Sequence, residues 1–180
     1  MTPAERERAI ASLAETRQRL LATAQRLSPS QLAYKPAPDR WSAAECIEHV
    51  ILVESAVLGM IQKTVAQAGD SLPSGAADEA LVAQAADRSQ RLNAPDRLVP
   101  TGRFAHHELL SEFEATRKRT SEFTVATDAN LRQSGFPHPV FGPLDCYQWL
   151  LLIPAHGERH RAQVEEVMAS PDFPRAASAG

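Results

Sequence analysis

The sequence has few aromatic residues, few glycines and no long apolar run. Aromatic residues make up 6% of the 180 residues, so a hydrophobic core must consist mostly of Leu, Val, Ile and Ala. Eight glycines among stretches rich in Ala, Leu, Glu and Arg favour helix over sheet. The longest apolar run, near residues 149–155, is far too short to cross a bilayer. We therefore expect a helical protein that does not span a membrane.

Cysteine and net positive charge are also scarce. Two cysteines make no disulfide framework and are typical of a reducing compartment. Residues 2–8 lack the apolar segment of a signal peptide, so we expect a cytoplasmic protein. A net charge of -3 offers no basic surface to phosphate, which argues against nucleic-acid binding. The length predicts one domain over residues 1–170, followed by a disordered tail at residues 171–180.

Hydrophobic periodicity predicts four long amphipathic helices and one short one. The long helices are expected at about residues 4–27, 43–67, 104–127 and 146–169. A short helix is expected at about residues 79–92, between the second and third long helices. Ser42 with Glu45, and Asp145 with Gln148, are capping pairs that mark the starts of the second and fourth long helices.

The connections between these helices are rich in proline and glycine. Residues 34–40 are expected to be extended and residues 137–143 irregular, because proline disfavours helix in both. Loops are expected at residues 69–78 and 93–102. The fold class is therefore all-α, a four-helix bundle. The second long helix is apolar on nearly every face, which predicts burial on more than one side and favours a homodimer.

Three of the six histidines fall on inward-facing stripes of the predicted helices. His156 and His160 are four residues apart, so their rings project from one helix face within about 6 Å of each other. That spacing lets two imidazoles bind one metal ion. His49 lies about two turns into the second long helix, and His156 lies about three turns into the last. If these helices are neighbours, three imidazoles converge at a similar depth.

Burial of three imidazoles in an aliphatic core needs a physical reason. Each ring must find hydrogen-bond partners or incur a cost of about 1–3 kcal/mol. A divalent cation removes that cost by accepting the lone pairs, and three nitrogens leave a coordination position open, as in catalytic zinc sites. The alternative is that each ring bonds to a protein group. For His49 alone that interpretation is at least as good, whereas the pair His156 and His160 favours a metal.

Other metal motifs are excluded by spacing. Zincin proteases need His-Glu-x-x-His, but Glu158 is two residues from both His156 and His160, about 200° round the helix. Its carboxylate therefore points away from a metal, and we interpret it as a surface or intersubunit charge. Di-iron bundles need a Glu three residues before a ligating His, and no Glu holds that position before the three histidines.

Two polar residues are candidates for an outer shell around the metal. Glu45 is one turn before His49 and could accept a hydrogen bond or carry a proton, although its capping role is the better interpretation. Gln163 is one turn past His160 and could bond to a ligand or a substrate. The remaining candidates are structural or peripheral: Cys46 and Cys146 as packing residues, His106 and His107 as solvated or capping residues, and His138 as a loop residue that could approach the site.

Three segments together resemble one known family. These are residues 41–49 (WSAAECIEH), residues 138–144 (HPVFGPL) and residues 156–163 (HGERHRAQ). Their order and separation resemble the DinB-like (YfiT-like) family of metal-dependent proteins, from the first helix to about Met168. The resemblance implies a four-helix bundle, often dimeric, with a divalent metal on His49, His156 and His160. Despite the family's name, the resemblance is not to a DNA polymerase.

The same resemblance implies a range of chemistry. Related members include thiol-S-transferases that use bacillithiol and mycothiol-dependent maleylpyruvate isomerases, so a low-molecular-weight thiol is an expected cosubstrate. Zinc or nickel is favoured as the metal, with manganese or iron as alternatives. Two residues depart from the family pattern. Gly157 replaces a bulkier helix former, and Pro154 removes a helical hydrogen bond and should bend the helix just before the ligands.

We therefore expect a metal-dependent transferase or hydrolase that acts on a small electrophilic molecule. The metal would lower the pKa of bound water toward about 7, or bind a thiol as its thiolate. The alternative is a non-catalytic helical-bundle dimer that binds a metal or a ligand. The two hypotheses differ in solvent access, because a catalytic site needs an open cleft and a structural metal is sealed.

Overall fold

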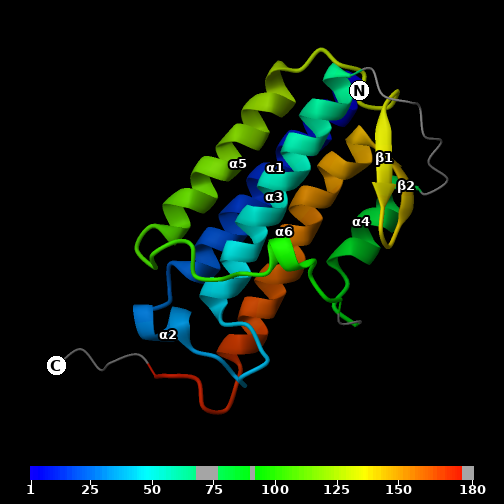
Figure 1. Cartoon of the computed structure of the whole chain (residues 1–180). Helices are drawn as coiled ribbons and strands as arrows, with labels where there is room; N and C mark the ends of the chain where they lie inside the picture. Colours follow the sequence, from blue (N-terminus) through cyan, green and yellow to red (C-terminus); the bar gives the residue numbers. More distant parts are fainter. Residues whose placement is uncertain (68–76, 90–91, 176–180) are drawn as a thin grey trace.

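The computed structural model describes residues 1–67, 77–89 and 92–175. Four long helices form a bundle: α1 (Pro3–Ala24), α3 (Ala43–Ala66), α5 (Leu109–Ala126) and α6 (Cys146–Met168). The smaller elements are α2 (Pro29–Ala33), α4 (Asp78–Ala86), the 3-10 helix η1 (Asp96–Leu98), and strands β1 (Gly135–His138) and β2 (Gly142–Asp145). The all-α four-helix bundle and the extra short helix are confirmed (Figure 1).

The long helices are arranged so that α3 and α6 are neighbours. Each long helix packs against two others, α1 against α5 and α6, and α3 against α5 and α6. Figure 1 shows α3 and α5 running in one direction and α1 and α6 in the other. Because α3 and α5 are parallel, the chain between them must return along the bundle, and α4 packs on α6 within that return. The loop expected at residues 69–78 falls almost wholly outside the described residues.

Capping boxes fix where α3 and α6 begin. Ser42 Oγ accepts from the Glu45 amide at 3.1 Å, and Glu45 Oε2 accepts from the Ser42 amide at 2.7 Å. Asp145 Oδ1 accepts from the Gln148 amide at 2.8 Å at the start of α6. Each box satisfies amides that a helix start leaves without partners. Both predicted starts are confirmed, and they set the height of each histidine along its helix.

Other boundaries differ from the prediction. Helix α1 ends at Ala24, and Ser28 starts α2, because its hydroxyl accepts from the Gln31 amide as an N-cap. Helix α5 begins at Leu109, later than predicted, because residues 106–108 form a turn. Helix α4 ends at Ala86, short of the predicted end.

The segment expected to be a disordered tail is described as far as Arg175. Gln31 Nε2 donates to the Pro174 carbonyl at 2.8 Å, and the ring of Phe173 contacts the ring of Tyr34 at 5.5 Å between centroids. These contacts hold residues 173–174 against α2. Residues 176–180 lie outside the described part of the chain.

The connection before α6 was predicted to be irregular and is a β-hairpin. Strands β1 and β2 pair antiparallel, with Pro137 opposite Pro143. Proline is tolerated because both strands of a two-stranded ribbon are edge strands, so an amide can be absent on the outer side. Gly135 permits the close pairing, since a Cβ there would lie 2.2 Å from the Leu144 carbonyl oxygen. The hairpin places residues 138–141 beside α6.

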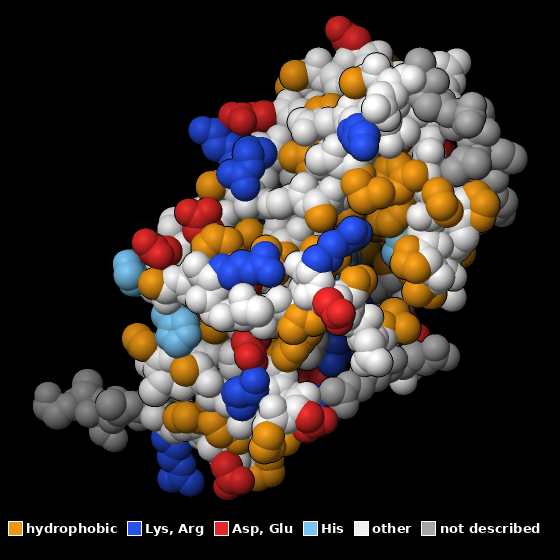
Figure 2. All heavy atoms as spheres, viewed as in Figure 1, with side chains coloured by type: hydrophobic (Ala, Val, Ile, Leu, Met, Phe, Trp, Pro, Cys, Tyr) orange, Lys and Arg blue, Asp and Glu red, His pale blue; other side chains and the backbone are white. Residues whose placement is uncertain are grey.

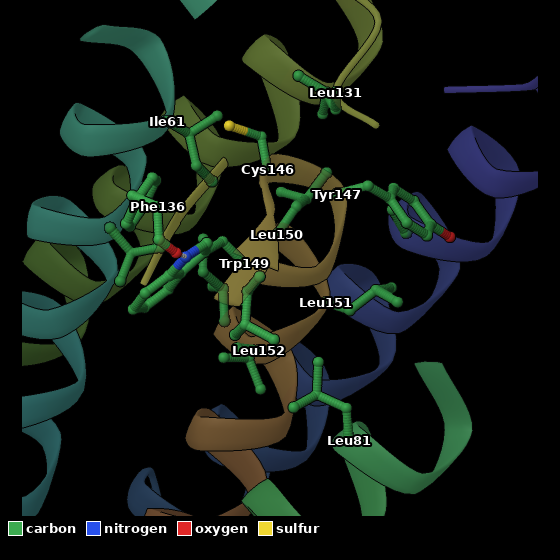
Figure 3. Packing of buried hydrophobic residues seen from close by; sticks show 14 of the residues in the cluster. Ile61, Leu81, Leu131, Phe136, Cys146, Tyr147, Trp149, Leu150, Leu151 and Leu152 are labelled. Atoms are coloured by element: carbon green, nitrogen blue, oxygen red, sulfur yellow. Dashed lines mark hydrogen bonds between the residues drawn. The ribbon is translucent and has the colours of Figure 1, made fainter. Parts of the chain in front are cut away.

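The hairpin and α6 share one hydrophobic core. Trp149 Nε1 donates to the Phe136 carbonyl at 2.9 Å, and the two rings stack at 4.5 Å. Figure 3 shows these rings together, with Leu81 of α4 on the side of α6 that carries Leu151 and Leu152.

None of the described helices combines the length and apolar character needed to cross a membrane.

Candidate metal centre

Helices α3 and α6 bring His49, His156 and His160 into one cluster. The ring centroids are 5.0 Å apart for His49 and His156, 4.7 Å for His49 and His160, and 4.4 Å for His156 and His160. One possible ligand nitrogen from each ring lies within 4.8 Å of the others. The structure therefore places the three predicted ligands at one level of the bundle.

Outer hydrogen bonds orient two of the three rings. His49 Nδ1 lies 2.7 Å from the Leu98 carbonyl oxygen, and His160 Nδ1 lies 3.0 Å from Gln163 Oε1. Both oxygens are acceptors, so each Nδ1 carries the proton. Nε2 of each ring is consequently unprotonated. This is the arrangement in which a second group fixes the tautomer of a metal-binding histidine.

The inner nitrogens fit a divalent cation. Nε2 of His156 lies 3.1 Å from Nε2 of His160. Two nitrogens in a tetrahedral zinc site are separated by about 3.3 Å, given zinc–nitrogen bonds of about 2.0–2.1 Å. Three neutral imidazoles are also a donor set that suits zinc, nickel, copper or iron.

Burial keeps these rings neutral. It lowers the pKa of His49, and it holds the pKa values of His156 and His160 well below the ordinary value, with a contribution from the neighbouring histidines. Neutral imidazole is the form that binds metals, because protonation removes the lone pair. The cluster is therefore ready to accept a cation at neutral pH.

A chain of polar contacts supports Gln163. Arg88 Nη1 donates to Gln163 Oε1 at 3.1 Å, and Arg88 is held by two bonds of 2.7 Å to the Glu166 carboxylate. Arg88 thereby keeps the amide oxygen turned toward His160. The sequence prediction included Gln163 as an outer-shell residue but missed Arg88, which approaches from beyond the end of α4 and has no periodic relation to the histidines.

Glu48 positions the carbonyl group that His49 contacts. Its buried carboxylate accepts from the amides of Thr101, Gly102 and Arg103 at 2.8, 2.9 and 3.2 Å. These bonds hold the segment after η1 against α3, and Leu98 is the last residue of η1, just before that segment. Sequence reasoning missed this role, because a Glu beside a predicted ligand is indistinguishable from a surface charge.

Glu45 is placed away from the metal centre. Its carboxylate bonds to the Ser42 amide and, at 2.8 Å, to Lys35 Nζ. The capping interpretation of Glu45 is thus the one that its contacts support. The ring of Trp41, the residue before the α3 N-cap, lies 4.8 Å from the ring of His49 and 6.0 Å from that of His160.

The two departures from the family pattern leave the histidines together. Pro154 lies inside α6, which continues through it, and the rings of His156 and His160 still converge. Gly157 faces the interior of the bundle, where a Cβ would lie 3.4 Å from Arg117 Nη2. A glycine at this position leaves room for that buried guanidinium.

Several other candidates lie outside the cluster. Glu158 bonds to Arg161 and faces α1, where Arg19 lies 3.7 Å away, so it points away from the histidines as predicted. Burial raises the pKa of the Cys46 thiol to about 12 and that of Cys146 to about 11, which supports packing roles. His106 and His107 are exposed.

A cavity of about 830 Å³ opens onto the cluster. It lies between α3 and α6 and is closed by the end of α4, the η1 segment and the hairpin turn. Figure 2 shows the hollow, with pale-blue histidine surface inside it and hydrophobic side chains along its hairpin side. His156 is only half-buried, so the cavity reaches the cluster. The site thus combines convergent nitrogens with room for a small molecule.

Comparisons with known proteins agree with this fold. YuaE of Bacillus subtilis, an uncharacterized protein, is 29% identical over 147 residues, which cover 78% of this chain and 85% of YuaE. The solved structure of YfiT from Bacillus subtilis, described as a probable metal-dependent hydrolase with an unusual four-helix bundle topology, covers 93% of this chain and 88% of its own. Its TM-score is 0.62 at 15% identity, which shows a shared fold. The sequence profile of the DinB superfamily matches residues 12–164, and the chain belongs to that superfamily.

Proposed function

We propose that this protein is a metal-dependent enzyme, with a divalent cation held by His49, His156 and His160 and a small molecule bound in the adjoining cavity. The observation that supports it most is the pair of outer hydrogen bonds. They leave Nε2 of His49 and of His160 without a proton, beside Nε2 of His156. The description of YfiT as a probable metal-dependent hydrolase favours hydrolysis or group transfer as the reaction class.

The three histidines and their hydrogen-bond partners have different roles around the cation. The three histidines would hold it, while Leu98 and Gln163 keep two of the rings in the correct tautomer. When bound, the metal supplies Lewis-acid chemistry that activates a water molecule or a thiol. The apolar part of the cavity wall lowers the local dielectric constant, which strengthens electrostatic interactions beside it.

The cavity distinguishes this proposal from a sealed structural metal. A structural zinc site is closed by four protein ligands, whereas here the described residues contribute three nitrogens and the half-buried His156 borders open space. An open position beside a cavity is typical of a catalytic site. The expected homodimer and thiol cosubstrate stay predictions.

Metal analysis tests the ligand assignment. The purified protein should retain about one divalent ion per chain after dialysis, and the His156→Ala variant should retain little. His107→Ala, in an exposed histidine, is the matched control and should retain the metal. Equal metal content in the His156→Ala variant and the unaltered protein would contradict the assignment.

A reaction screen tests the reaction class. The metal-loaded protein is given activated esters and amides, first in water and then with bacillithiol, mycothiol or glutathione. Turnover without a thiol that is lost in the His156→Ala variant indicates a hydrolase, and turnover that needs a thiol indicates a transferase. Absence of turnover in both arms, with metal bound, favours the non-catalytic alternative.

A further inference from the structure

His138 lies on the hairpin wall of the cavity and belongs to no part of the metal centre described above. Its ring contacts two aromatic rings that also line the cavity, at 4.5 Å from Phe141 and 4.8 Å from Trp149 between centroids. Trp149 precedes His156 by seven residues on α6, about 10 Å along the helix axis. His138 therefore lines the same cavity as the three clustered histidines without being one of them.

Backbone contacts fix the tautomer of His138. Its Nδ1 accepts hydrogen bonds from the amides of Val140 and Phe141, at 3.0 and 3.2 Å. A nitrogen that accepts two amide hydrogens cannot itself carry one, so the ring proton is on Nε2. His138 is consequently a hydrogen-bond donor at Nε2. It cannot offer that nitrogen as a metal ligand without losing the proton.

The Nε2–H group has no protein acceptor among the residues that the structure describes. Every buried side-chain nitrogen and oxygen in that part of the chain has a hydrogen-bond partner. The contacts of His138 with described residues are confined to its Nδ1 and its ring faces. Its Nε2 is therefore open to the cavity that the residue lines. Burial lowers the pKa of His138 to about 4, so this donor is neutral at pH 7.

We propose that the Nε2–H group of His138 donates a hydrogen bond to an oxygen of the substrate, at a point away from the metal-binding nitrogens. This proposal rests on the proposed function. It specifies the substrate as a molecule with two polar ends: one group at the metal, and a carbonyl or similar oxygen acceptor that reaches His138. The part between them lies along the apolar wall formed by Val53, Leu152 and Ile153.

A purely structural role is the competing explanation, and it depends on the other ring nitrogen. If His138 only holds the hairpin turn, its contribution is the acceptor at Nδ1. If it also binds substrate, its contribution includes the donor at Nε2. Asparagine and glutamine separate these roles, because Asn Oδ1 can occupy the position of Nδ1 and Gln Nε2 can occupy that of the histidine Nε2.

The test uses matched metal-binding probes on the zinc-loaded protein. The probes are linear hydroxamic acids of graded length that end either in a methyl ketone or in an apolar group of the same shape. Calorimetry gives the ratio of the two affinities at each length. The His138→Asn variant should lower the preference for the ketone by about fivefold, the typical contribution of one neutral hydrogen bond. The His138→Gln variant should retain most of it.

Two measurements on the metal-free protein test the donor independently. Nitrogen chemical shifts should show His138 protonated at Nε2 and unprotonated at Nδ1. Amide exchange at Val140 and Phe141 should speed up in the His138→Gln variant and stay slow in the His138→Asn variant. Both measurements report on folded protein, so a variant that fails to fold is recognised directly.

The possible outcomes separate the two proposals. A proton on Nδ1, or an unchanged ketone preference in the His138→Asn variant, overturns the role of His138 and leaves the metal centre intact. If only the His138→Gln variant loses the preference for the ketone, the role of His138 is limited to holding the hairpin turn. If the protein binds zinc but no hydroxamate, the cavity does not present the metal to substrates and both proposals fail.

Discussion

Two clusters of buried polar side chains meet helix α6 at neighbouring residues, and they differ in how their hydrogen bonds are satisfied. Near Gly157, the guanidinium of Arg117 donates to the Glu54 carboxylate at 2.9 Å, and to the Leu13 carbonyl and the Thr16 hydroxyl. Thr120 donates to the same carboxylate at 2.7 Å. Donors and acceptors match, so this cluster is complete without a ligand.

The cluster at His156 is fully matched only on its outer side, because the contact between Nε2 of His156 and Nε2 of His160 can share one proton at most. Leu98 and Gln163 occupy the outer nitrogens of His49 and His160, while the inner nitrogens face one another. The inner nitrogens bring lone pairs together with too few protons between them, and this arrangement favours a bound cation. The comparison shows that burial of polar groups does not by itself indicate a functional site, and that the balance of donors and acceptors does.

The largest expected effect is on the complete cluster. Arg117→Met should lower the free energy of unfolding by about 3–5 kcal/mol, because it leaves the Glu54 carboxylate buried without its cation. Arg117 and Glu54 are 1% and 2% exposed, so water cannot compensate. Urea unfolding measures the change. The exposed Arg119→Met variant is the control and should change stability by less than about 0.5 kcal/mol. Similar losses in the two variants would show that the cluster is no more important than a surface charge.

The next effect is on the incomplete cluster. Gln163→Leu should weaken metal binding by about 10–100-fold, because His160 loses the acceptor that fixes its tautomer. Competition with a chelator of known affinity measures the change. The matched control is Gln62→Leu, in an exposed residue of α3. If Gln163→Leu binds metal as tightly as that control, the outer hydrogen bond does not position the ligand.

A smaller effect concerns acid stability of the metal-free protein. Burial lowers the folded-state pKa of the three histidines below their unfolded value of about 6.5, so the unfolded chain takes up protons first as the pH falls. Their contribution is complete above about pH 6.5 and declines below it, by up to about 1.4 kcal/mol per pH unit for each histidine. His156→Leu should reduce the slope of the free energy of unfolding against pH by one such increment. The exposed His107→Leu variant should leave that slope unchanged. Equal slopes in the unaltered protein and both variants would contradict burial as the cause.

The smallest effect separates helix capping from metal binding. Glu45→Ala should cost about 1 kcal/mol or less, because the α3 capping box loses its carboxylate. Metal affinity should stay unchanged, since Glu45 bonds to Ser42 and Lys35 and not to His49. Chemical unfolding and metal titration measure the two quantities. A marked loss of metal affinity would assign Glu45 to the site after all.

Local signals in the sequence were sufficient for the elements that carry the histidines. The capping pairs at Ser42 and Asp145 gave the starts of α3 and α6, and the four-residue spacing placed His156 and His160 on one face. Capping and helical spacing depend on neighbours in the sequence, so one chain is enough to detect them. The convergence of His49 with the other two depended on the packing of α3 against α6, which the sequence left conditional.

The features that the sequence did not predict depend on distant contacts or on backbone atoms. Pro137 and Pro143 indicated an irregular loop, although they face each other across a two-stranded ribbon. The contact of the Leu98 carbonyl with His49 involves a backbone atom, so residue types give no signal for it. Arg117 lies on the buried face of α5 beside Phe113, where periodicity assigns only apolar residues to the core. A charged residue can be assigned to the core only when its partner on another helix is known.

Backbone atoms hold both ends of the segment from Leu98 to Arg103: its first carbonyl contacts His49, and its last three amides contact Glu48. Substituting the side chain of Val99, which faces the cavity, leaves both anchors in place. Lengthening the segment by even one residue would separate them. Engineers who wish to alter the size of molecule admitted here should therefore exchange residues along this wall and avoid insertions.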